Sequence, residues 1–291
     1  MNSEMHLHYF TTQKDFPFFI QYGHHDENMF LHSHADFSEL VFVLGGYATH
    51  IVNEEEYSIK KGDVFVINEN TSHSYKDPHH FRICNIMFQP DYFLRDFGDI
   101  KSLPGYHSLF VIEPALTQQN GFQSRLHLSP ERFEEFDHMI TRIHHENVSH
   151  PAGFQSMTSG LFLQMITSLA RIASDDRREP NDNTVSLANT AAYMEYHFRE
   201  DISIEDLASM SGMSSRHFRR VFHDIYGTSP LKYLHTLRIR SAARLLRSTD
   251  LPVTEIAIRS GYPDGNYFSG KFKQLMGMPP LKYRNQHTHE A

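Results

Sequence analysis

An internal repeat in about the last 90 residues constrains the fold of this chain more than any other feature. Ala208 and Gly212 recur as Ala257 and Gly261, at an offset of 49 residues. Beyond one added residue the offset is 50, and the matching pairs are Phe218 and Phe268, Phe222 and Phe272, Gly227 and Gly277, Pro230 and Pro280, and Leu231-Lys232-Tyr233 and Leu281-Lys282-Tyr283. A fixed offset indicates that one supersecondary unit occurs twice.

Each copy has the pattern of a helix-turn-helix. In the first copy, Ser203 and Asp206 form a capping pattern at the start of a helix. Gly212 can adopt a positive φ in the turn, and Ser214 or Ser215 can cap the next helix. The inward positions of that second helix are Phe218, Val221 and Phe222. The C-terminal domain is therefore predicted to be all-α, with two helix-turn-helix units.

The outward face of the second helix is basic in the first copy. It carries Arg216, His217, Arg219 and Arg220. An arginine guanidinium matches the O6 and N7 atoms of guanine, or a phosphate, so this helix suits the major groove of DNA. The ordinary alternative for each arginine is a solvated helix face.

The matching helix of the second copy presents Asn266, Ser269, Gly270 and Lys273 outward. Asn266 suits adenine, and Lys273 suits a phosphate. A helix of roughly 17 residues between the copies, about 25 Å long, would place two such helices in successive grooves. Double-stranded DNA is therefore the expected partner.

Residues 186 to 285 resemble the DNA-binding domain of the AraC/XylS family of transcription regulators. The motifs that carry the resemblance are Ile204-x2-Leu207-Ala208-x3-Gly212-Met213-Ser214, Phe218-x2-Val221-Phe222, Gly227-x2-Pro230-x2-Tyr233, Ile256-Ala257-x3-Gly261-Tyr262, Tyr267-Phe268-x3-Phe272-Lys273 and Gly277-x2-Pro280-x2-Tyr283. The resemblance implies base-facing positions for the three arginines and for Asn266, Ser269 and Gly270. Many members carry a larger polar residue at Gly270, so the second helix is expected to contact fewer bases. The family also implies a homodimer that activates transcription, with RNA polymerase as a further partner.

The charge of the chain is divided unevenly. The net charge is −8, but residues 184 to 291 hold 14 Lys and Arg against 10 Asp and Glu, a balance of +4, which leaves −12 for the rest. A basic DNA-binding domain joined to an acidic sensor would show this asymmetry. The polar, proline-containing stretch 174–184 is the predicted linker, and 185–291 is the predicted DNA-binding domain.

The N-terminal part alternates in short β-rich segments, which predict a cupin-like β-barrel over residues 1–128. Ser129, Pro130 and Glu131 then supply a cap and a first helical turn. Apolar positions at helical spacing predict two amphipathic helices within 129–173. One interpretation is that these helices only pack on the barrel, and the alternative is that one face makes a dimer contact as well.

Four residues of the barrel resemble the two cupin motifs: His32, His34, Glu39 and His73. Their donor set would suit a divalent metal such as Zn, Mn, Fe or Ni. The alternative is that these residues line an effector pocket whose aromatic walls include Phe42 and Tyr47. Asn68 and Asn70 stand where metal-binding cupins usually keep proline and glycine, which favours the effector pocket.

The barrel segments also resemble those of regulators of L-rhamnose use, so a sugar is the expected effector. The leading interpretation is therefore regulation without catalysis. One alternative is a metal-dependent cupin enzyme fused to a DNA-binding domain, and another is an architectural DNA-binding protein without a ligand. The sequence has no signal-peptide pattern and no apolar run of the ~20 residues that a spanning helix needs, so a cytoplasmic location is expected.

Overall fold

The computed structural model of the chain describes residues 3–13, 15–52, 55–94, 97–120, 126–175 and 183–287, without the side chains of 117–120 and 183. The chain divides into two compact units, Met1–Glu179 and Pro180–Ala291. Residues 176–182 of the predicted linker 174–184 lie outside the described part of the chain. Among the described residues, no helix combines the length and apolar character that crossing a membrane requires.

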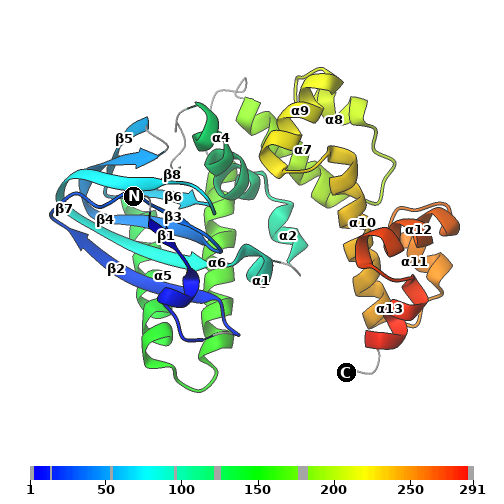
Figure 1. The fold of residues 1–291 in the computed structure, drawn as a ribbon, viewed down its shortest axis with the longest axis horizontal. Helices are drawn as coiled ribbons and strands as arrows, with labels where there is room; N and C mark the ends of the chain where they lie inside the picture. Colours follow the sequence, from blue (N-terminus) through cyan, green and yellow to red (C-terminus); the bar gives the residue numbers. More distant parts are fainter. Residues whose placement is uncertain are drawn as a thin grey trace. The chain divides into compact units, whose positions relative to one another are not determined.

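One sheet dominates the first unit (Figure 1). Its strands are β1 (Ser3–Met5), β2 (Phe18–His25), β3 (His32–His34), β4 (Ser38–Val52), β5 (Glu55–Lys60), β6 (Asp63–Ile67), β7 (His73–Phe88) and β8 (Leu126–His127). The strand order is β1-β3-β7-β4-β6-β8, with β2 added to β7 and β5 added to β4. The β-rich N-terminal domain that the sequence predicts is thus confirmed.

The long antiparallel pair of β4 and β7 gives the sheet its two distinct faces. Its register shifts at three places between Val43 and Thr49, and such bulges bend a strand and re-aim its side chains. The sheet encloses one apolar cluster by itself: Val41, Val43, Ala48, Ile59, Phe65, Ile67, Tyr75, Phe81 and Ile83. Because these side chains are buried without any helix in the cluster, the sheet curls around them, as the predicted barrel requires.

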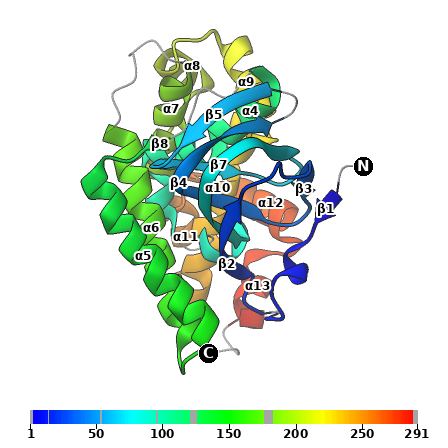
Figure 2. The same ribbon diagram turned by 90° about the vertical axis from the view of Figure 1, so that its left-hand side faces the viewer.

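Helices cover the other face of the sheet. The short ones are α1 (Pro90–Leu94), α2 (Gly98–Lys101), α3 (Pro104–Tyr106), the π-helix η2 (His107–Ile112) and α4 (Glu113–Asn120). The 3-10 helix η1 (Leu7–Tyr9) instead packs with Phe37 and Met87. The two long ones, α5 (Pro130–Ser149) and α6 (Phe154–Asp175), lie side by side against the sheet (Figure 2). The hydroxyl of Ser129 accepts a hydrogen bond from the backbone N–H of Arg132, which confirms the predicted cap.

The second unit is all-α. Its helices are α7 (Asn183–His197), α8 (Ile204–Met210), α9 (Ser215–Tyr226), α10 (Pro230–Ser248), α11 (Val253–Arg259), α12 (Gly265–Met276) and α13 (Pro280–His287). The pairs α8–α9 and α11–α12 are the two predicted helix-turn-helix units. Ser203 and Ser214 cap α8 and α9 as expected. The connecting helix α10 has 19 residues, which makes it about 28 Å long.

Candidate functional site

Helix α9 presents a basic face to solvent. Phe218 and Phe222 are buried, and this fixes which side of the helix points outward. The predicted DNA-contacting residues Arg216, His217, Arg219 and Arg220 are all exposed. Gly227 ends the helix in the left-handed conformation, with φ of +65°.

Two contacts hold side chains of this face without burying them. A guanidinium nitrogen of Arg220 donates to Nδ1 of His217 at 3.2 Å. A nitrogen of Arg219 lies 3.9 Å from Oε1 of Glu205, and both side chains are more than half exposed. Exposed ion pairs contribute little to stability, so a phosphate or a base can displace Glu205 at small cost.

Helix α12 presents a less charged face. Asn266, Gly270 and Lys273 are exposed, while Ser269 is half-buried. The Ser269 hydroxyl donates to the backbone oxygen of Gly265 at 2.8 Å, so its proton is used within the helix. A Cβ added at Gly270 would meet no atom within 4 Å, so this position is open.

A polar junction ties helix α10 to the second helix-turn-helix. The two ring nitrogens of His235 lie 2.9 Å from the hydroxyl of Tyr262 and 3.3 Å from that of Tyr267. Burial, and then the nearby Lys271 and Arg238, lower the pKa of His235. A neutral imidazole has one donor and one acceptor nitrogen, which matches two tyrosine hydroxyls.

The junction also reaches the segment between α7 and α8, which precedes the first helix-turn-helix. Arg238 donates from Nε to the carbonyl of Phe198 at 2.6 Å, and from Nη2 to that of Glu200 at 2.7 Å. Gly261, in the turn of the second helix-turn-helix, has φ of +86°, and a Cβ there would lie 2.9 Å from the carbonyl oxygen of Arg199. The repeat gives no signal for this junction, because Gly212 at the matching position meets nothing within 4 Å.

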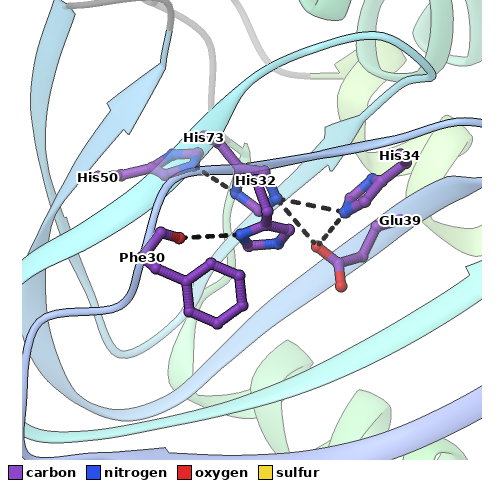
Figure 3. A network of polar contacts seen from close by, with 6 residues as sticks. All are labelled: Phe30, His32, His34, Glu39, His50 and His73. Atoms are coloured by element: carbon purple, nitrogen blue, oxygen red, sulfur yellow. Dashed lines mark hydrogen bonds and ion pairs between the residues drawn. The ribbon is translucent and has the colours of Figure 1, made fainter. Parts of the chain in front are cut away.

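In the first unit, the structure brings the four cupin-like residues together on the enclosed face of the sheet (Figure 3). His32 on β3 pairs in register with His73 on β7, and His34 follows two residues later on the same face. The Nε2 atoms of His34 and His73 lie 3.3 Å apart. Oε2 of Glu39 lies 3.9 Å and 3.8 Å from these two atoms.

Neighbouring groups orient the rings of this histidine cluster. Nδ1 of His32 donates to the carbonyl of Phe30 at 3.1 Å, which leaves its Nε2 as the free lone pair. Nδ1 of His73 lies 3.4 Å from Nε2 of His50, a fifth residue that sequence reasoning missed. Phe37 stacks on His34, and Phe65 stacks on His50.

Burial sets the protonation of the histidine cluster. The four predicted residues are at most 2% exposed. Burial lowers the pKa of His34 and of His50 to about 3 and raises that of Glu39 to about 8. Oε2 of Glu39 and Nδ1 of His34 have no hydrogen-bond partner among the described residues. At neutral pH the imidazoles are therefore neutral, and the Glu39 carboxyl is protonated unless a cation lies beside it.

The histidine cluster is also closed. The cavity lined by His50, Asn68 and Thr71 has a volume of about 10 Å³. This is roughly what one water molecule needs, far less than a monosaccharide. His32, His34, Glu39 and His73 do not line this cavity. Each of them is at most 2% exposed, so they offer no open face to an organic effector in this conformation.

Two residues expected in the effector pocket lie elsewhere. Phe42 packs under the helices, with its ring 5.8 Å from that of Phe136, because residues 39 and 42 of a strand point to opposite faces. Tyr47 is 52% exposed and stacks on His79. The expectation that Phe42 and Tyr47 line the same pocket as the histidines is wrong.

Comparison with known proteins matches both units. The family described as an AraC-like ligand binding domain matches residues 17–166, and a helix-turn-helix domain family matches residues 207–286. The HTH-type transcriptional activator RhaR of Enterobacter sp. (strain 638) is 27% identical over 261 residues, which cover 89% of each chain. The HTH-type transcriptional activator RhaS of Escherichia fergusonii is 29% identical over 261 residues, covering 89% of this chain and 88% of that one.

The DNA-binding domain of AdpA, the global transcriptional factor, in complex with a target DNA is among the solved structures similar to part of this chain. It is 34% identical, covers 36% of this chain and 95% of that chain, and has a TM-score of 0.35.

Proposed function

Since the chain belongs to the AraC family and carries both its ligand-binding and its helix-turn-helix domain, we propose that it activates transcription from specific sites on double-stranded DNA. The observation that carries this proposal is the exposed basic face of α9, set in one of two matching helix-turn-helix units. The activity follows the names of the relatives, which are transcriptional activators and not enzymes. We further propose a cytoplasmic homodimer that contacts RNA polymerase and responds to a small effector of the sugar class.

The DNA-binding proposal is tested with the purified full chain. Fluorescence anisotropy with duplexes from the region upstream of its own gene should show binding that weakens steeply as salt rises, because phosphate contacts release counterions. One duplex should be bound at least ~10³-fold more tightly than random DNA of equal length. Binding that is insensitive to salt, or equal on all duplexes, would contradict the proposal.

We also infer that the histidine cluster holds a divalent ion through His32, His34, His73 and Glu39. Two ligand atoms on a tetrahedral zinc, with bonds of about 2.0–2.1 Å, lie about 3.3 Å apart, which matches the separation of the Nε2 atoms of His34 and His73. The ion would stabilise the ionised form of the Glu39 carboxyl, whose Oε2 accepts no hydrogen bond from any described residue. Because the cluster is closed to solvent, its role would be to join β3, β4 and β7 rather than to catalyse a reaction.

Elemental analysis tests this inference. Protein purified without chelators should carry about one zinc, manganese, iron or nickel ion per chain. Glu39→Gln and His73→Ala should lose the ion, while His138→Ala, an exposed histidine on α5, should retain it. Metal-free protein whose melting temperature does not respond to any of the four ions would overturn the inference.

A further inference from the structure

A second, open pocket lies away from the histidine cluster, between α5 and the face of the sheet that the helices cover. It encloses about 530 Å³, within the range of small-molecule sites. The residues used below are Tyr22, Lys61, Arg82, Phe133, Asp137 and Thr141, all of which line it. We call this pocket the α5 groove.

The α5 groove carries two cations against one anion. The Arg82 guanidinium lies close over the backbone of β4 at Gly45. A Cβ added at Gly45 would lie 2.8 Å from the Nε and Nη2 atoms of Arg82. Only glycine leaves that space. Nζ of Lys61 lies 4.7 Å from the centre of the Phe133 ring, so its charge also borders the groove. Asp137 supplies the opposite charge.

The α5 groove also has aromatic and hydroxyl groups suited to a sugar ring. Tyr22 is 46% exposed, so part of its ring faces the opening. The Tyr22 hydroxyl is hydrogen-bonded to Thr141, which links β2 to α5. Aromatic faces pack against the apolar side of a sugar, while carboxylate and hydroxyl groups bind its hydroxyls.

We propose that the α5 groove is the effector site, and that the effector is a monosaccharide bearing an anionic group. Its charge would pair with Arg82 and Lys61, and its hydroxyls with Asp137 and Thr141. This inference rests on the proposed function in assuming that the protein responds to an effector, and it moves that effector out of the closed histidine cluster. A ligand there would bridge β2, β7 and α5.

Calorimetric titration and thermal unfolding of the full chain test the proposal. D-glucuronate and D-glucose 6-phosphate serve as probes, with neutral D-glucose for comparison, and the two anions distinguish a carboxylate from a phosphate ligand. At least one anion should bind and raise the melting temperature. Arg82→Ala should weaken that binding at least tenfold, as expected for loss of a charge-assisted hydrogen bond.

Two further variants sharpen the test. Arg142→Ala removes an exposed arginine of α5 that does not line the groove, and it should bind like the unmodified chain. Gly45→Ala should displace the guanidinium while keeping its charge. This clash involves the end of a flexible side chain, so the chain should still fold and bind the anion more weakly.

Three results would overturn the proposal: neither anion binds, D-glucose binds equally well, or Arg82→Ala binds as tightly as the unmodified chain. DNA binding without ligand is measured in parallel on every variant. If the unmodified chain binds no DNA, the proposed function is refuted. If it binds DNA but neither anion, only the proposal that the α5 groove is the effector site is refuted.

Discussion

Gly212 and Gly261 hold the same position in the two copies of the repeat, yet they have different surroundings. Both have positive φ, of +65° and +86°. Gly261 alone lies against the backbone of Arg199, so a side chain there meets a carbonyl that cannot move freely.

We therefore expect Gly261→Ala to cost more than Gly212→Ala. Each change carries the penalty of a left-handed Cβ, about 1–2 kcal/mol. Gly261→Ala adds an overpacking cost of about 1–3 kcal/mol. Urea unfolding of the two variants gives the difference, and equal losses would show that the contact with Arg199 does not form.

Arg219→Ala is expected to weaken DNA binding. If its guanidinium contacts a base edge, specific binding should fall by about 1–3 kcal/mol and non-specific binding by less. Anisotropy titrations with cognate and random duplexes measure both. Arg171→Ala, on α6 of the other unit, is the control. Equal losses on both duplexes would identify Arg219 as a phosphate contact.

Spacing in the sequence was enough to predict that His32, His34, Glu39 and His73 converge, although their ligand remains a prediction. The same two-residue period, counted from Glu39, places Phe42 on the opposite face of the strand and would have excluded it from the effector pocket. It would not have found His50, because the bulges between Val43 and Thr49 shift which side chains face inward. Bulges depend on tertiary packing and leave no clear mark in one sequence.

At the scale of elements, the C-terminal helices were predictable because local chemistry fixes their ends. Ser203, Ser214 and the glycine after α9 act within a turn of their own helices. The short helices between residues 90 and 120 were not predicted, since their stretch has no clear period. The π-helix η2 is stabilised by the burial of its own side chains against other elements. Its first residue, His107, is 1% exposed.

Helix α12 contains a glycine that nothing in the free chain requires. Gly270 is interior to the helix, and a Cβ would meet open space, so Gly270→Ala should stabilise the second unit by about 0.5–1 kcal/mol. Gly277→Ala, at the left-handed end of the same helix, should destabilise it instead. Urea midpoints report both. A loss of stability in Gly270→Ala would contradict the helical geometry at this position.

At the scale of the whole molecule, buried histidines make stability depend on pH. Burial lowers the pKa of His107 to about 4, and its Nε2 donates to the carbonyl of Lys101 at 2.7 Å. Below pH 6.5 His107 becomes protonated in the unfolded chain but stays neutral in the folded chain until the pH approaches 4. The contribution of His107 to stability is therefore complete above pH 6.5 and falls as the pH drops towards 4.

His107→Gln should remove this part of the pH dependence while keeping a donor for Lys101. Between pH 7 and pH 5 the unmodified chain should lose about 2 kcal/mol more than the variant. Denaturant unfolding at the two pH values measures the difference. His138→Gln should retain the pH dependence of the unmodified chain, and an identical loss in His107→Gln would refute the assignment.

The junction of His235, Arg238 and Gly261 ties the second helix-turn-helix to α10 and to the segment between α7 and α8, and it thereby fixes the separation of α9 and α12. Each added base pair rotates the duplex by about 34–36°. A rigid pair cannot follow that rotation, so an operator lengthened by one base pair between its two contacts would present the second one out of phase. If both helices contact one duplex, selection on the binding sites of this protein acts on the distance between two short sequences as strictly as on their bases.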